Sequence, residues 1–193
     1  MNLLEIEMKY EVLKDEFIEL NGRKLYRIKA LKNFCHIEKG EVGGYIESEQ
    51  NLSQKGGAWV SGNAWVSGDA QVYGGARVYG DAQVYGDAWV SDNARVHGDA
   101  RVYGNALVSD NAQVSNRHSV VWFSNVGTEN GTLTVYCGKN GLIATRGCFI
   151  GSVEEFLAKP AKVHGEKTKR EYELLIEVAR SRLKEAQGNI GSE

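Results

Sequence analysis

A six-residue repeat occupies residues 58–115 and constrains the fold more than any other feature of the chain. A period of six fits neither the turn of an α-helix nor the seven-residue repeat of a coiled coil. It fits short β-strands in which alanine and valine, two positions apart, point the same way, with Gly-Asp or Asp-Asn corners between them. We therefore expect Ala and Val to fill a narrow interior while the residues between them face outward. The alanines are Ala58, Ala64, Ala70, Ala76, Ala82, Ala88, Ala94, Ala100, Ala106 and Ala112, and a valine follows each two positions later.

The stretch GDAQVYGGARVYGDAQVYGDAWVS, which begins at Gly68, resembles the hexapeptide repeat of left-handed parallel β-helices. That family includes acyltransferases and γ-class carbonic anhydrases. The resemblance implies that three hexapeptides form one triangular coil, so that residues 58–115 make a little over three coils. Ile46 and Leu52 would begin one more coil, separated from the others by a two-residue slip at Gly56-Gly57. We therefore expect a left-handed parallel β-helix of about four coils.

The whole chain is also similar to a narrower group of phage and prophage proteins. These are often described as hexapeptide-repeat or polymer-forming-cytoskeletal-like proteins, and their function is poorly established. The similarity is carried by LYRIKAL and IEKGEVGGYIESEQNLS before the repeat and by NGTLTVYCGKNGLIATRGCFIGSVEEF after it. The resemblance implies a phage origin and no particular activity.

The flanking segments predict caps, which a solenoid needs because its ends expose apolar interior and unpaired strand edges. YEVLKDEFIEL and RKLYRIKAL predict a β-hairpin around Asn21-Gly22. SVVWFSNVG, TLTVYCG and LIATRGCFIG predict three further strands, with a hairpin loop at residues 139–141. Ser152 and Glu155 form a capping box, and apolar spacing predicts an amphipathic helix over residues 167–186. The fold is therefore mainly β, with an N-terminal hairpin and cap at 1–45, the β-helix at 46–118 and a C-terminal α+β module at 119–193.

Composition indicates a cytoplasmic protein without a membrane segment. The N-terminal residues MNLLEIEMKYEVLKDE carry acidic residues where a secretory signal would have a basic start and an apolar core. No run of apolar residues is long enough to span a bilayer. The three cysteines are widely spaced and lack a CxxC pair, which is typical of reduced thiols. If the chain is phage-encoded, we expect it in the cytoplasm of the host cell.

The outward columns of the solenoid are rich in tryptophan, tyrosine and arginine. These residue types dominate binding hot spots, because they bury a large area and still form hydrogen bonds. Aromatic residues also favour β-surfaces through stacking between strands, and both explanations remain open. Exposed tryptophans on so small a solenoid favour a buried interface, and a homotrimer, the habit of the resembling fold, would bury them. The candidate binding residues are Trp59, Trp65, Arg77, Tyr79, Tyr85, Trp89, Arg95, His97, Arg101 and Tyr103.

His97 is the one histidine of the repeat and a weak candidate for catalysis. With Asp99 two residues later it could form a histidine–carboxylate pair that acts as a general base. The simpler interpretation is an outward residue in a column where other coils carry serine or tyrosine. No loop interrupts residues 58–115 that could close over a cofactor, so we expect no catalytic residue and no cofactor.

Metal and nucleic-acid binding are also disfavoured. A γ-carbonic-anhydrase zinc site needs three histidines, and only His97 and His118 lie in or near the coils. Corner Asp and Asn residues could line up for calcium, but the same residues are ordinary turn formers, so we expect no metal. The repeat has three Arg and six Asp and no Lys, which leaves little attraction for phosphates.

These observations predict a non-enzymatic, phage-derived binding or assembly protein that acts through protein–protein contacts. A host-interacting or anti-defence role follows from the phage resemblance. One alternative is an acyltransferase of the hexapeptide-repeat class that uses His97 at a subunit interface. A second alternative is a sponge that sequesters a small ligand such as a nucleotide.

Overall fold

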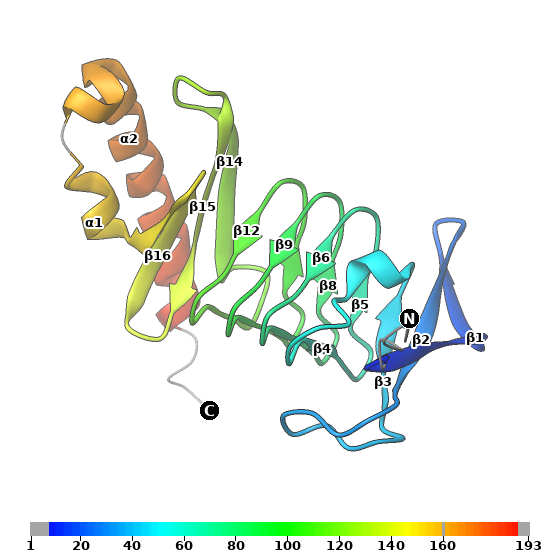
Figure 1. The fold of residues 1–193 in the computed structure, drawn as a ribbon. Helices are drawn as coiled ribbons and strands as arrows, with labels where there is room; N and C mark the ends of the chain where they lie inside the picture. Colours follow the sequence, from blue (N-terminus) through cyan, green and yellow to red (C-terminus); the bar gives the residue numbers. More distant parts are fainter. Residues whose placement is uncertain (1–7, 160, 189–193) are drawn as a thin grey trace, which may run out of the picture.

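The alternation of Ala-x-Val with tight corners produces ten short strands that wind along one axis. In the computed structural model, which describes residues 8–159 and 161–188, these strands form the middle of an elongated molecule (Figure 1). The N-terminal hairpin lies at one end and a sheet with two helices lies at the other (Figure 1). The predicted class, a mainly β protein built on a parallel β-solenoid of about four turns, is confirmed.

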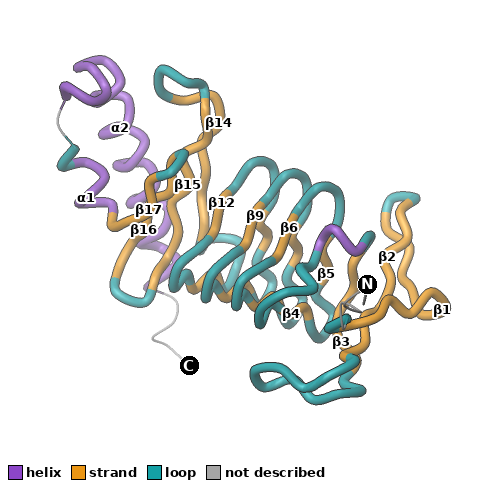
Figure 2. The backbone as a smooth tube through the Cα atoms, viewed as in Figure 1, coloured by secondary structure: helices purple, strands orange, loops and turns teal. Residues whose placement is uncertain are grey.

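Each of the first seven solenoid strands pairs in parallel with the strand 18 residues later, as Trp59 does with Arg77 and Arg77 with Arg95. The pairing creates three flat faces, made by β4–β7–β10–β13, by β5–β8–β11 and by β6–β9–β12. Figure 2 shows these short strands separated by loops on every coil. The strands are β4 (Trp59–Val60), β5 (Trp65–Val66), β6 (Gln71–Val72), β7 (Arg77–Val78), β8 (Gln83–Val84), β9 (Trp89–Val90), β10 (Arg95–Val96), β11 (Arg101–Val102), β12 (Leu107–Val108) and β13 (Gln113–Val114).

The interior is a single column of the repeated alanines and valines. Every one of these residues from Ala58 to Val114 is at most 1% exposed, as the repeat predicts. Alanine leaves room at the narrow corners, and valine fills the space behind each strand, so that successive coils stack without a change of side-chain volume.

The corners require a left-handed backbone at every sixth residue. Glycine supplies it at most corners, for example Gly80 (φ 73°) and Gly98 (φ 61°). Asp92 and Asp110 occupy the same corner position with φ of 54° and 58°. Aspartate tolerates this conformation better than most residues, because its short side chain bonds locally. The Gly-Asp and Asp-Asn corners of the sequence are therefore one structural element.

The first coil is two residues longer than the others. Tyr45 pairs with Trp65 and Leu52 with Val72, both 20 positions later, whereas Trp59 pairs with Arg77 after 18. The extra residues lie between Leu52 and Ala58, where Gly56 has a φ of 70°. The predicted slip at Gly56-Gly57 is confirmed.

The N-terminal hairpin continues one face of the solenoid. It consists of β1 (Tyr10–Leu20) and β2 (Arg23–Ala30), and both residues of the Asn21-Gly22 turn have positive φ, as predicted. β3 (Val42–Ile46) pairs antiparallel with β2 and parallel with β5, so one sheet runs in the order β1-β2-β3-β5-β8-β11. A short 3₁₀ helix, η1 (Glu49–Asn51), follows.

The C-terminal module contains four strands where three were predicted. These are β14 (Val120–Val126), β15 (Gly131–Gly138), β16 (Gly141–Arg146) and β17 (Phe149–Ser152). The run LIATRGCFIG is divided because Gly147, with φ of 57°, turns the chain between β16 and β17. The hairpin loop between β15 and β16 is shorter than the predicted loop at 139–141, because Gly141 already pairs with Gly138.

Two helices complete the module. The Ser152–Glu155 capping box starts α1 (Val153–Leu157), as predicted. The helix expected over residues 167–186 lies within α2 (Ala161–Gly188), which is kinked at Gly165. Tyr172, Ile176, Ala179 and Leu183 form its buried side. Neither described helix combines the length and the apolar content that a bilayer span needs.

The C-terminal sheet separates the solenoid from the helices (Figure 2). Along β15, Leu133 and Val135 pack in the apolar cluster that includes the α2 residues, while Thr134 and Tyr136 reach the last coil of the solenoid. Because side chains of a strand alternate between its two faces, one sheet can cap the solenoid and carry the helices at once.

Candidate binding face

The β5–β8–β11 face carries the most continuous row of aromatic side chains. The rings of Trp65 and Tyr85 are 5.5 Å apart between centroids, and those of Tyr85 and Tyr103 are 4.9 Å apart and nearly parallel. Trp122 of β14 adds a fourth ring, 4.4 Å from Tyr103 and at 87° to it. We call these four residues the aromatic row. Three of them were predicted as binding residues.

Sequence reasoning missed Trp122, because this residue lies beyond the repeat. It stands 19 positions after Tyr103, one more than the length of a coil. The spacing could have indicated that a fourth aromatic residue continues the column.

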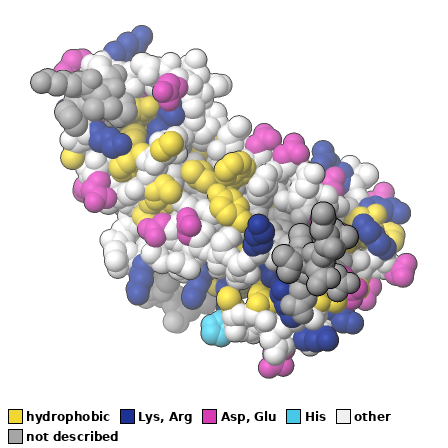
Figure 3. Space-filling view, viewed as in Figure 1, with side chains coloured by type: hydrophobic (Ala, Val, Ile, Leu, Met, Phe, Trp, Pro, Cys, Tyr) yellow, Lys and Arg dark blue, Asp and Glu magenta, His cyan; other side chains and the backbone are white. Residues whose placement is uncertain are grey.

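A groove of about 780 Å³ runs beside the aromatic row. Trp65, Tyr85 and Arg101 lie along its floor, and the hairpin residues Leu20 and Arg23 form its N-terminal wall. On the side of the molecule shown in Figure 3, basic side chains gather most densely over the N-terminal elements.

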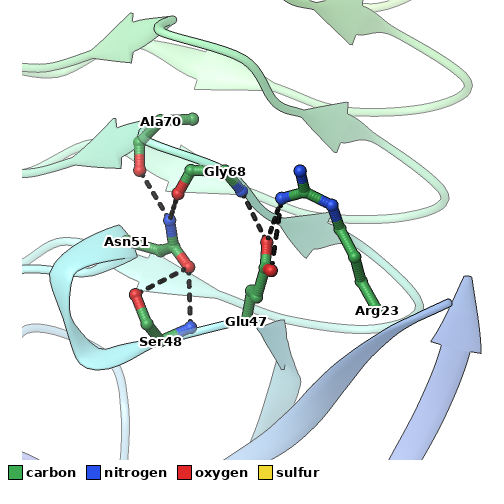
Figure 4. A network of polar contacts seen from close by, with 6 residues as sticks. All are labelled: Arg23, Glu47, Ser48, Asn51, Gly68 and Ala70. Carbon is green, nitrogen blue, oxygen red and sulfur yellow. Dashed lines mark hydrogen bonds and ion pairs between the residues drawn. The ribbon is translucent and has the colours of Figure 1, made fainter. Parts of the chain in front are cut away.

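Polar contacts fix the N-terminal wall of this groove to the solenoid (Figure 4). Arg23 forms an ion pair with Glu47 at 3.0 Å, and the same carboxylate accepts the backbone N–H of Gly68 at 2.7 Å. The buried Asn51 amide donates to the carbonyl oxygens of Gly68 at 2.8 Å and Ala70 at 2.9 Å. The corner at Gly68 is therefore held from two elements, which keeps the wall rigid.

Arg101 is the main cation on the floor of the groove. Its guanidinium forms no ion pair with any described residue, and its buried Nε atom has no hydrogen-bond partner there. Burial and the nearby Tyr103 hydroxyl raise the pKa of Tyr85, and Arg101 acts in the opposite direction. Asp69 and Asp87 line the corner on the opposite side of the groove, both exposed. The face thus offers aromatic, cationic and anionic groups side by side.

The β4–β7–β10–β13 face holds the predicted columns, but one of its residues was assigned wrongly. Trp59 was expected to be exposed and is only 2% exposed. The rings of Tyr10 and Phe34 lie 6.3 and 5.4 Å from it, because the N-terminal cap folds over this end of the face. Trp59 is therefore core. Arg77 and Arg95 lie in register on neighbouring strands of the same face.

His97 stacks on Tyr79, with ring centroids 4.8 Å apart and the planes nearly parallel. The pair that His97 could have formed with Asp99 is not made, because Asp99 forms an ion pair with Arg117 at 3.3 Å. Burial, assisted by the charge of Arg95, lowers the pKa of His97. The imidazole is therefore a neutral, stacked ring at pH 7, with no carboxylate to orient it as a base.

The β6–β9–β12 face is the least aromatic of the three. Trp89 is 46% exposed there, with the ring of Tyr73 6.1 Å away at 84°. The outward serine positions differ from the expectation of exposure, since Ser91 and Ser109 on this face and Ser67 on the β5–β8–β11 face are all buried. Serine is small enough for the larger neighbouring side chains to cover it.

Corner side chains form hydrogen bonds between coils. The Asn63 amide donates to the Asp81 carboxylate of the next coil at 3.1 Å. Within residues 8–159 and 161–188, no three His, Cys, Asp or Glu side chains gather in a way that could hold a metal ion. The side chain of His164 lies outside this description.

Comparison with known families supports the same architecture. The family model described as the YdcK β-solenoid repeat matches residues 70–86, 82–98 and 100–116. The match and the parallel strand pairing agree that the middle of the chain is a repetitive β-solenoid. Each matched stretch covers about one coil, and together they end where the C-terminal cap begins. No curated protein matches the chain.

Proposed function

We propose that this β-solenoid is a non-enzymatic binding protein that recognises a protein partner through the β5–β8–β11 face. The observation that carries the proposal is the aromatic row beside an open groove. Neighbouring rings of the row contact each other, with centroids 4.4 to 5.5 Å apart, in the order Trp65, Tyr85, Tyr103 and Trp122. Each ring is held by its neighbour, so binding costs little side-chain entropy.

The chemistry of the face suits a protein surface. Tyrosine and tryptophan provide apolar area with a polar atom, and arginine provides a planar cation, which are the residue types of interface hot spots. The groove combines Arg101 on its floor with the exposed carboxylates of Asp69 and Asp87 at the corner beside it. A partner segment with apolar side chains and both signs of charge would complement it. The resemblance to phage proteins leads us to place this partner in a host cell, where its occlusion would serve an anti-defence role.

Self-association is the second part of the proposal. Trp89 is 46% exposed on the β6–β9–β12 face, and Leu107 lies half-buried beside it on the adjoining strand. A trimer that covers this apolar pair leaves the aromatic row free for the partner. Native mass spectrometry tests this part: we expect three times the 21.3 kDa chain mass, and a single-chain mass contradicts it.

Partner capture tests the aromatic face. The purified protein is immobilised and exposed to a lysate of the producing cells, and the retained proteins are identified by mass spectrometry. Trp65→Ala and Tyr85→Ala should abolish retention of a specific protein, whereas the matched control Tyr79→Ala on the β4–β7–β10–β13 face should not. Equal retention by all three variants, or no specific retention by the wild type, contradicts the proposal.

A further inference from the structure

The C-terminal cap covers the last coil of the solenoid unevenly. The edge of β12 is covered, because the Leu107 N–H donates to the Thr134 hydroxyl and the Ser109 N–H to the Tyr136 hydroxyl. A bridge between Ala112 and Gly138 lies beside β13. β11, in contrast, is the last strand of its sheet, since β14 pairs with β15 and leaves β11 unpaired on that side.

The uncovered edge of β11 opens into a cleft of about 350 Å³. Volumes of this order hold small organic ligands. Tyr103 and Trp122 form aromatic walls, and Val120 and Val121 of β14 form an apolar one. The backbone N–H of Tyr103 faces this edge and donates to no acceptor among the described residues. The cleft therefore has apolar walls and an unused backbone donor.

Two guanidinium groups give the cleft a positive charge. Arg101 and Arg117 both line it, and none of its lining residues is acidic. Arg101 has no ion-pair partner among the described residues, and its Nε atom is buried without a hydrogen bond. Among the described residues Arg117 forms its ion pair with Asp99, in a contact whose side chains are 53% and 58% exposed, and such pairs are weak. Arg101 can therefore bind an anion directly, and Arg117 can do so by giving up a weak, exposed ion pair.

We propose that the cleft between β11 and β14 binds a small organic anion that carries a planar ring. The anionic group lies between Arg101 and Arg117 and accepts the Tyr103 N–H, and the ring packs against Trp122. Phosphate and carboxylate groups both fit this chemistry, since guanidinium binds either through paired N–H donors. The cleft adjoins the protein-binding face and shares Tyr85 and Arg101 with its groove, but Arg117 lies outside the groove that Trp65 lines.

Calorimetric titration with four probes tests the two halves of the proposed ligand. AMP carries a ring with a phosphate, indole-3-acetate carries a ring with a carboxylate, adenosine lacks the charge, and inorganic phosphate lacks the ring. We expect at least one of the two ring anions to bind with a Kd on the order of 10 to 100 µM at low salt. Adenosine and inorganic phosphate should each bind at least tenfold more weakly. A comparison of the two ring anions shows whether the cleft prefers a phosphate or a carboxylate.

Substitutions in the cleft test whether the probe binds there. Arg101→Gln and Trp122→Leu should each weaken binding of the preferred probe at least tenfold, and the exposed Arg117→Gln serves as a second cation variant that does not touch the core. Arg77→Gln is the matched control, because Arg77 is half-buried at the equivalent position of another face. The proposal is overturned if neither ring anion binds, if either single-component probe binds as tightly, or if the Arg101 and Arg117 variants bind normally. Trp65→Ala should leave this binding unchanged, so loss of the partner site and loss of the anion site are told apart.

Discussion

The hydroxyl group of Tyr136 hydrogen-bonds to the backbone of Ser109, where β12 ends its sheet and no further coil follows. It accepts the Ser109 N–H at 3.2 Å and donates to the Ser109 carbonyl oxygen at 3.1 Å. In the preceding coils the corresponding N–H bonds to the next coil, as the Ser91 N–H does to the Val108 carbonyl oxygen. One buried side chain thus ends the ladder of hydrogen bonds, with Thr134 and Thr145 acting in the same way at Leu107.

Tyr136→Phe should destabilise the protein without changing its fold. The substitution keeps the ring and leaves the Ser109 N–H buried without a partner, whereas the Ser109 carbonyl oxygen still accepts the Ala112 N–H. A lost partner of this kind costs about 1–3 kcal/mol. Urea unfolding monitored by circular dichroism measures the loss. Tyr79→Phe is the control, because the Tyr79 hydroxyl forms no hydrogen bond with a described residue and should change the stability by less than about 0.5 kcal/mol. Equal stability of the two variants would show that water replaces the hydroxyl.

The sequence predicts the solenoid well because its repeat is local and regular. Ala and Val two positions apart decide which side of each strand is buried, and the same pattern recurs in every coil. The caps are less predictable, because their contacts join distant segments. Thr134 and Tyr136 are ordinary strand residues in the sequence, and their role depends on how β15 meets the coil ending at Ser109.

Two glycine variants separate backbone conformation from steric overlap. Gly22 and Gly98 both have positive φ, but a Cβ atom at Gly22 meets no atom within 4 Å. A Cβ atom at Gly98 collides with the carbonyl oxygen of Ser115 in the next coil. Gly22→Ala should therefore cost about 1–2 kcal/mol for conformation alone. Gly98→Ala should cost roughly 1–3 kcal/mol more, because the coils must separate. Thermal and urea unfolding measure both, and equal losses would mean that the coils spread freely.

Lys9 closes the opposite end of the solenoid as a buried cation. It is 1% exposed, its Nζ atom donates to the Ala58 carbonyl oxygen at 2.8 Å, and it lies 5.1 Å from the centre of the Phe34 ring. Burial lowers the pKa of Lys9 from 10.5 to about 8, although the nearby Cys35 acts in the opposite direction. The neighbouring Tyr10 hydroxyl donates to Leu52 at 2.7 Å.

The stability of the protein should rise with pH just above pH 8 because of Lys9. Between about 8 and 10.5 the unfolded chain holds a proton that the folded chain has released, so the free energy of unfolding increases with pH. One such proton contributes at most about 1.4 kcal/mol per pH unit. Urea unfolding between pH 7.5 and 9.5 should show a steeper slope for the wild type than for Lys9→Met. The exposed Lys55→Met serves as control, and parallel curves for the wild type and Lys9→Met would contradict the prediction.

The candidate site was only partly predictable, for a related reason. The 18-residue coil places Trp65, Tyr85, Arg101 and Tyr103 on one face, and that much follows from counting. Trp59 follows the same count and is nevertheless buried, because the cap residues that cover it are remote in sequence. A repeat predicts the surface of its own coils and does not predict what folds back onto them.

The partly buried His97 should make the protein less stable as the pH falls. Burial, together with the charge of Arg95, lowers the pKa of His97 below its ordinary value of 6.5. The unfolded chain therefore takes up a proton at a higher pH than the folded chain, and the free energy of unfolding falls as the pH drops below about 6.5. We expect the wild type to lose more stability than His97→Gln between pH 7 and 5, and Arg95→Gln to reduce the difference. Thermal unfolding at several pH values measures this, and the same His97→Gln protein should retain its partner in the capture experiment. Loss of capture with normal folding would instead point to a direct role for the imidazole.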